Sequence, residues 1–172
     1  FGTIGGGHLE HAAIGIARDL LAAGGASALH RFPLGASLGQ CCGGVAQLLL
    51  EPVCGSAAWL EAVVKLRTEG VECALVTPTR GDTDAQRRII TATTALGTLG
   101  SVRFDDEATA LARAMLDEGS KPRLVTLGAG PGLDVFIDIV RKPDFAIVLF
   151  GAGHVGRAVV RALADIDCRI TW

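Results

Sequence analysis

The sequence lacks the features of a nucleic-acid-binding protein. Tyrosine is absent, aromatic side chains make up 5% of the 172 residues, and 16 lysine and arginine residues stand against 18 acidic ones. The basic residues are spread along the chain and form no stripe that could follow a phosphate backbone. Nucleic acid is therefore not an expected partner.

The sequence also lacks long hydrophobic runs. Its apolar stretches, such as FAIVLFGAG at residues 145–153, are far shorter than the roughly 20 residues that a bilayer-spanning helix needs. No basic segment followed by an apolar one opens the chain. We therefore expect no membrane span or anchor.

Cysteine is scarce and unsuited to a disulfide framework. The five cysteines are odd in number, and two adjacent ones could bridge only through a strained ring. Reduced thiols favour a cytoplasmic protein. The cysteines are Cys41, Cys42, Cys54, Cys73 and Cys168, of which the last three lie in or beside apolar strands and are expected to be inert core.

Apolar spacing predicts an α/β protein in two parts. Helical spacing and glycine stops indicate helices over residues 8–24, 56–69 and near 107–119. Extended runs indicate strands over 27–34, 45–53, 71–79, 122–128 and 134–141, with 45–53 buried, and leave 89–100 unassigned. A linker near 142–144 separates a mixed α/β domain (1–142) from the first βαβ piece of a Rossmann-type domain (143–172), which the chain leaves incomplete.

The motif GAGHVG at residues 151–156 follows an apolar strand and opens a helix. In such a GxGxxG unit Gly151 makes the tight turn, Gly153 lets a pyrophosphate approach the backbone, and Gly156 lets the helix pack on the strand. His154 at the helix start would face a bound phosphate, or serve only as a structural contact. The acid that would hold a ribose falls beyond Trp172, so the motif leaves open nucleotide binding and a scaffold role.

A second glycine cluster, GTIGGGHLEH at residues 2–11, also enters a helix. Gly5, Gly6 and Gly7 permit positive φ and close backbone approach, so the turn could cradle an anion or could be a flexible entry to the helix. His8 and His11 lie three residues apart with Glu10 between them. No third metal ligand is near in the sequence, so a metal site is disfavoured.

The segment GQCCGG at residues 39–44 places two thiols between glycines. It lacks CxxC spacing, which disfavours a redox pair or a zinc site. Cys41 and Cys42 are then either small buried residues or reactive thiols, because amides in so open a loop, with Gly43 and Gly44, can lower a thiol pKa. Cys42, which adjoins the glycine pair, is the better candidate for a metal or sulfur contact.

The motifs FGTIGGGHLEHAA, LGQCCGGVAQLLLEP and FGAGHVGRAVVRAL follow one another in this order. Together they resemble the XdhC/CoxI family of xanthine dehydrogenase accessory proteins over most of the chain. The resemblance implies two domains, a homodimer and a cytoplasmic maturation factor. Such a factor binds molybdenum cofactor, supports its sulfuration by a cysteine desulfurase, and delivers it to a xanthine dehydrogenase-type enzyme.

The resemblance implies a non-enzymatic chaperone for molybdopterin, with or without a nucleotide extension. A cleft between the two domains would hold the cofactor, with Cys42 facing the metal. By position, the binding residues would be Gly5, Gly6, Gly7, Glu10, Cys41, Cys42, Gly43, Gly44, Gly151, Gly153, His154 and Gly156.

A nicotinamide-dependent oxidoreductase is the main alternative. It rests on GAGHVG alone, and the chain shows no convincing catalytic acid/base pair. A regulatory module whose βαβ piece only dimerises is a third possibility, and it predicts no ligand at either glycine cluster.

Overall fold

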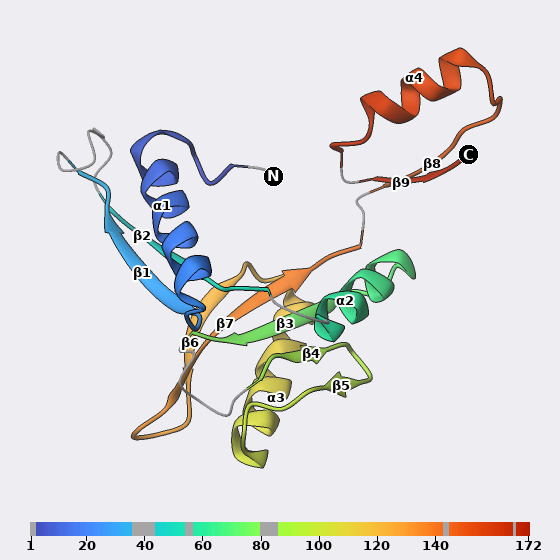
Figure 1. Ribbon diagram of the computed structural model, residues 1–172. Coiled ribbons are helices and arrows are strands. Elements are labelled where there is room, and N and C mark those ends of the chain that lie inside the picture. The colour runs from blue at the N-terminus through green and yellow to red at the C-terminus, as the bar shows by residue number, and fades with distance from the viewer. Residues whose placement is uncertain (1–2, 36–43, 54–56, 80–85, 143–144, 167) are drawn as a thin grey trace.

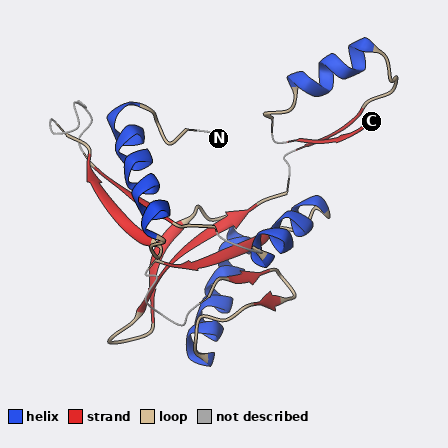
Figure 2. Cartoon of the chain, in the orientation of Figure 1, coloured by secondary structure: helices blue, strands red, loops and turns tan. Residues whose placement is uncertain are grey.

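A computed structural model describes residues 3–35, 44–53, 57–79, 86–142, 145–166 and 168–172. Helices are interspersed with groups of strands through these segments, which confirms a mixed α/β class (Figures 1 and 2). No helix in the described segments is long and apolar enough to cross a membrane.

A five-stranded sheet forms the centre of the molecule, in the order β5-β4-β3-β7-β6 with every neighbouring pair antiparallel. The longest pairing joins β3 to β7, from Cys73 level with Val140 to Pro78 level with Val135. The strands are β3 (Cys73–Pro78), β4 (Arg88–Ile90), β5 (Ala95–Leu96), β6 (Arg123–Leu127) and β7 (Leu133–Val140).

One face of this sheet packs against α3 (Val102–Glu118) and holds the main core. Strand side chains alternate between faces, so Val135, Ile137 and Ile139 of β7 all point to the α3 side. Ala108 and Ala112 are fully buried there, and their small side chains let the helix approach the strands closely. The Ser101 side chain caps α3 by accepting from the Phe104 amide at 3.3 Å.

The opposite face of the sheet is covered only in part. Here α2 (Ala58–Thr68) packs Val63 against Cys73 and Ile89, at the β3–β4 side. Phe136 and Asp138 of β7 also point to this face but belong to neither core cluster. The β7–β6 side of the face therefore borders a cavity, described below.

The N-terminal part consists of α1 (Gly7–Ala23) and the antiparallel hairpin β1 (Ala28–Pro33) and β2 (Val45–Leu50). Leu9 and Ala13 of α1 and Phe32 of β1 are its buried apolar side chains. In Figure 1 the start of α1 and the end of the hairpin where Pro33 pairs with Val45 lie at the same end of this part.

The C-terminal part consists of β8 (Phe145–Val148), α4 (His154–Ala162) and β9 (Cys168–Thr171). The two strands pair in parallel, Phe145 level with Cys168 and Val148 level with Thr171, with α4 between them in sequence. Figure 1 shows this unit set apart from the five-stranded sheet. It is the predicted strand–turn–helix–strand pattern, whereas a Rossmann-type domain and a boundary at residue 142 stay predictions.

Three details of the sequence interpretation were wrong or incomplete. Residues 45–53 do not form a buried strand, because β2 side chains are exposed or half-buried. The helix expected near 107–119 begins at Val102, one residue after its Ser101 cap. The unassigned stretch holds β4 and β5, joined through a turn in which the Thr91 hydroxyl accepts from the Thr94 amide at 2.9 Å.

Candidate functional site

The N-terminal glycine turn is built around a carboxylate. Residues 5–7 all adopt positive φ, of 116°, 71° and 65°, a conformation that favours glycine. Across this turn Glu10 Oε2 accepts hydrogen bonds from the Thr3 hydroxyl at 2.6 Å, the Gly6 amide at 2.9 Å and the Ile4 amide at 3.3 Å. The sequence thus places Glu10 one helical turn beyond the glycines, where it can close the turn.

These hydrogen bonds lower the pKa of Glu10 below its ordinary value, with the largest effect from the Thr3 hydroxyl, then the Gly6 and Ile4 amides. Glu10 is therefore ionised at neutral pH, and its charge lies at the N-terminus of α1, where unpaired amides favour an anion. The turn already holds an anionic group of its own. A bound anion would either use the remaining first-turn amides of residues 7–9 or displace Glu10.

In the sequence, the cysteine block lies between β1 and β2. The Leu34 amide donates to the Gly44 carbonyl at 2.9 Å, and this bond brings together the two ends of residues 35–43. Gly44 has φ of 135°, which the turn into β2 requires. Cys41, Cys42 and Gly43, predicted as site residues, lie outside the described residues, as does Cys54.

The other two cysteines lie within strands. Cys73 is fully buried on β3, and burial, together with the nearby Asp138 charge, raises the pKa of its thiol. It is thus a protonated core residue, as predicted. Cys168 on β9 is half-buried and, like Cys73, forms no disulfide.

The Gly151–Gly156 turn has the geometry that the motif predicts. Gly151 has φ of 101° and Gly153 is the N-cap of α4, with no side-chain cap. A Cβ at Gly156 would lie 2.5 Å from the Gly151 carbonyl oxygen, so only glycine fits. The same oxygen accepts from the Trp172 indole at 2.8 Å. His154 begins α4 and is exposed.

The space beside this turn is open. A Cβ at Gly151 or Gly153 would meet nothing within 4 Å. The first amides of α4 lack carbonyl partners within the helix, as at any helix start. The turn can therefore accept an anion without rearrangement of its own side chains.

No group of three or more metal-ligating side chains that could hold a metal ion occurs within the described residues. His8 and His11 lie on α1 and are both exposed.

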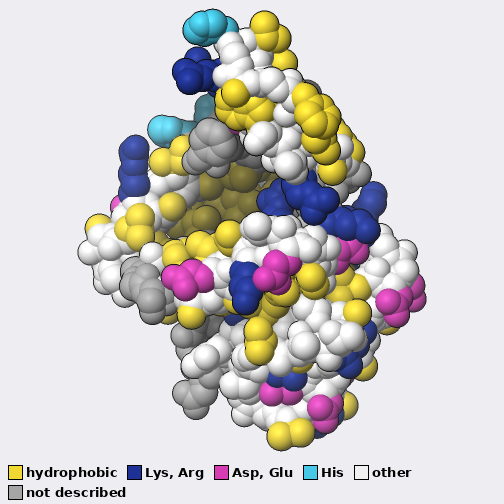
Figure 3. All heavy atoms as spheres, turned by 90° about the vertical axis from the view of Figure 1, so that its right-hand side faces the viewer, with side chains coloured by type: hydrophobic (Ala, Val, Ile, Leu, Met, Phe, Trp, Pro, Cys, Tyr) yellow, Lys and Arg dark blue, Asp and Glu magenta, His cyan; other side chains and the backbone are white. Residues whose placement is uncertain are grey.

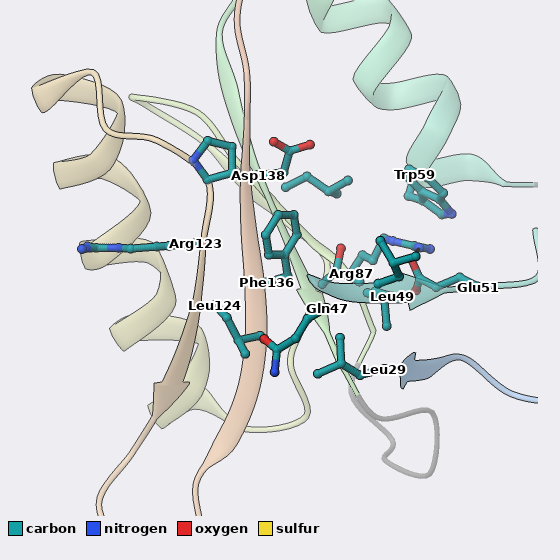
Figure 4. A pocket seen from close by; sticks show the side chains of 14 residues that line it. Leu29, Gln47, Leu49, Glu51, Trp59, Arg87, Arg123, Leu124, Phe136 and Asp138 are labelled. Atoms are coloured by element: carbon teal, nitrogen blue, oxygen red, sulfur yellow. Dashed lines mark hydrogen bonds and ion pairs between the residues drawn. The ribbon is translucent and has the colours of Figure 1, made fainter. Parts of the chain in front are cut away.

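A cavity of about 550 Å³ lies against the uncovered part of the five-stranded sheet (Figure 4). Its walls come from β1, β2, α2, β3, β6 and β7, together with residues 51, 87 and 122. Most of the lining is apolar, and Figure 3 shows hydrophobic side chains gathered in a hollow of the molecular surface beside Lys and Arg. The polar lining residues are Gln47, Glu51, Thr77, Arg87, Arg123 and Asp138.

One wall of the cavity is held by Arg87. Its guanidinium forms an ion pair and hydrogen bond with Glu51 and lies 3.9 Å from the centre of the Trp59 ring. Arg87 Nε is buried without a hydrogen-bond acceptor in the described part of the chain. The pair is largely buried, with 17% and 22% of the two side chains exposed, so each charge has an opposite charge beside it in this wall.

Sequence reasoning missed this cavity because its residues come from six elements. One signal was available: in DVFIDIVR the acids Asp134 and Asp138 interrupt an otherwise apolar strand and share a face with Phe136. A carboxylate on a half-buried strand needs a partner or access to a ligand or water.

The described elements define a mixed α/β protein with antiparallel sheets and a separate strand–helix–strand unit. Within it, residues 1–33 match the model of the XdhC and CoxI family. The match covers the glycine turn, α1 and β1, and it confirms the predicted resemblance over that segment. No curated protein matches the chain.

The match covers 33 of the 172 residues. The cysteine block and the Gly151–Gly156 turn lie outside the matched segment.

Proposed function

We propose that this protein is a molybdenum-cofactor chaperone. It binds and protects the cofactor, supports its sulfuration by a cysteine desulfurase, and delivers it to a xanthine dehydrogenase-type enzyme. It acts in the cytoplasm, as a homodimer, and does not itself turn over a substrate. The observation that carries the proposal is the family match over residues 1–33, the segment that contains the Glu10-closed glycine turn.

The residues present fit an anionic cofactor best at the Gly151–Gly156 turn. Open space at Gly151 and Gly153 and the uncapped start of α4 suit a phosphate, with or without a nucleotide. At the first turn Glu10 occupies two of the amides. We therefore assign Gly5, Gly6, Gly7 and Glu10 to a binding surface that the ligand reorganises, and Gly151, Gly153, His154 and Gly156 to a preformed one.

Cys42 would face the molybdenum end of the cofactor, flanked by Cys41, Gly43 and Gly44. A thiolate is a soft ligand that suits a metal bound by dithiolene sulfur. When bound, the cofactor supplies the molybdenum centre, while the chain's own residues bind its anionic end and shield its metal end. The Leu34–Gly44 hydrogen bond supports this role because it holds the ends of the cysteine segment at one place.

The first test replaces Cys42 with alanine in the full chain. We expect Cys42→Ala to lose most of the molybdenum cofactor that co-purifies with the wild type and to activate the client enzyme less. Cys168→Ala is the control, since it removes a free thiol outside the assigned binding residues and should retain the cofactor. Unchanged retention and unchanged activation in Cys42→Ala would exclude the assigned role.

A nicotinamide-dependent oxidoreductase is the second candidate, and it is supported by the GxGxxG spacing after a strand, the positive φ of Gly151 and the lack of space for a Cβ at Gly156. A thermal-shift comparison of molybdopterin species with NAD and NADP separates the two. Stabilisation by molybdopterin supports the chaperone, whereas stabilisation by NAD or NADP alone supports the oxidoreductase.

A further inference from the structure

We propose that the cavity on the uncovered face of the five-stranded sheet binds a planar heterocycle with a 2-amino-4-oxopyrimidine ring, which pterins and guanine share. The Asp138 carboxylate accepts hydrogen bonds from the N–H groups of that ring. The cavity is about 550 Å³, within the range of small-molecule sites. None of its described lining residues belongs to the glycine or cysteine motifs.

The Asp138 carboxylate is a hydrogen-bond acceptor of the cavity that the described residues leave unpaired. It is half-buried, lines the cavity, and forms no hydrogen bond or ion pair with any described residue. In Figure 4 the Arg123 side chain extends away from Asp138, and Arg87 is engaged with Glu51. A half-buried carboxylate without a partner is costly unless a ligand or water supplies donors.

Asp134, on the same strand, shows the contrast. Asp134 accepts from the Thr126 hydroxyl at 2.7 Å and does not line the cavity. The two acids lie on one face of β7, four residues apart. The strand thus carries one acid that is used within the fold and one that is presented to the cavity.

The cavity walls favour a flat, neutral ring over a small cation. Phe136 lies beside Asp138 on the same face of β7, and leucines of β1, β2, β3 and β6 supply further apolar surface. An ammonium ion would lose hydration against these walls for a single carboxylate. A planar heterocycle would bury its faces there while Gln47 and Thr77 offer groups to its other polar atoms.

The hydrogen-bonding geometry of a carboxylate determines which ligand groups we expect to face Asp138. Two adjacent N–H donors, one on the ring and one on the 2-amino group, match the two oxygens of Asp138 in a bidentate, charge-assisted contact. Metal binding is disfavoured because Glu51, the other acid of the cavity, is paired with Arg87. The choice of a pterin as first ligand rests on the proposed function, since molybdopterin contains this ring.

The experiment measures pterin binding to the full chain by quenching of pterin fluorescence, with lumazine as the matched ligand. Lumazine carries oxygen in place of the 2-amino group, so an acceptor would face the carboxylate. We expect lumazine to bind at least about tenfold more weakly than pterin. Guanosine serves as the second source of the same ring. If guanosine binds more tightly than pterin, the cavity is assigned to a purine. That result still supports recognition of the shared 2-amino-4-oxopyrimidine ring.

Asp138→Asn tests the residue, with Asp134→Asn as the matched control. Asp138→Asn should lose about tenfold or more of the pterin affinity, whereas Asp134→Asn should keep it. Equal binding of pterin and lumazine to the wild type overturns the inference without any variant. Equal loss of pterin affinity in both variants overturns the role of Asp138.

Cofactor retention separates this inference from the proposed function. The cavity assignment fails and the chaperone stands under one outcome. In that outcome the chain retains molybdenum cofactor, binds pterin and lumazine equally, and keeps its pterin affinity in Asp138→Asn. If the discrimination is present and retention and client activation are absent, the cavity stands and the chaperone fails.

Discussion

Glu10 gives shape to a turn whose residues have no side chains of their own. Three successive glycines have many conformations open to them in the unfolded chain, so ordering them costs conformational entropy. The Glu10 carboxylate offsets that cost through hydrogen bonds from the Thr3 hydroxyl and the Gly6 and Ile4 amides. The same residue is a candidate ligand contact in the family resemblance, and the structure shows it serving the fold.

The Glu10 arrangement predicts a pH dependence. The folded-state pKa of Glu10 lies below its ordinary value of 4.5. Its stabilisation is therefore fully present above that value and is lost as the pH falls through the folded-state pKa. Glu10→Gln should increase amide hydrogen exchange at Gly6 and Ile4 near pH 7, and the difference from wild type should disappear in strong acid.

Asp19→Asn is the matched control for Glu10→Gln, because Asp19 is an exposed acid on the same helix. It should leave exchange at the glycine turn unchanged at every pH. Equal exchange in Glu10→Gln and wild type at neutral pH would contradict the role given to the carboxylate.

Among the helices and strands, α3 is the element that packs most closely on the central sheet. Its buried face is narrow because Ala108 and Ala112 carry small side chains, and Met115 fills the space beyond them. Arg88 of β4 ties the start of the helix to the sheet through Asp105 at 3.4 Å and Thr109 at 3.2 Å. Apolar packing and polar contacts therefore both hold α3 in the same position on the sheet.

Enlarging a side chain on the buried face of α3 should separate the helix from the sheet. Ala112→Leu is expected to lower the free energy of unfolding by about 1–3 kcal/mol, because Ala112 is fully buried and overpacking strains its neighbours. Urea denaturation measures the change. Ala110→Leu makes the same substitution on the exposed side of the helix and should change stability little, and an equal loss in both variants would contradict this packing.

For the whole molecule, both core clusters lie within one part of the chain. Every residue of the two clusters and the side chains packed on them falls between Trp59 and Val140. The β8–α4–β9 unit leaves Phe145, Phe150 and Trp172 exposed by 47%, 90% and 52%. No described side chain of this unit belongs to either core cluster, so we expect the unit to contribute little to the stability of the central core.

A chain of residues 1–142 should therefore fold without the β8–α4–β9 unit. We expect a cooperative thermal transition by circular dichroism and dispersed amide resonances for β3, β4 and β7. The full chain measured under the same conditions is the reference. Loss of the transition in residues 1–142 would show that the C-terminal unit is required for the core, against the predicted boundary at residue 142.

Sequence patterning predicts elements well where one physical cue dominates. The helix of residues 7–23 carries spaced apolar residues and ends at Gly24 in the left-handed conformation. The β4–β5 hairpin was missed because threonine hydroxyls at Thr91 and Thr94, rather than an Asn-Gly pair, hold its turn. The β2 strand was misjudged because an apolar run looks buried whether or not another layer covers it.

The sequence by itself determined the α/β class, the positions of most helices and strands, and the glycine geometry around Gly151, Gly153 and Gly156. These features are local, since they depend on φ preference and on periodicity within a few residues. Only the tertiary structure decided that the central sheet is antiparallel, that Glu10 closes its own turn, and that Asp138 faces a cavity. Strand order and cavity lining depend on contacts between residues far apart in the chain, which no local pattern encodes.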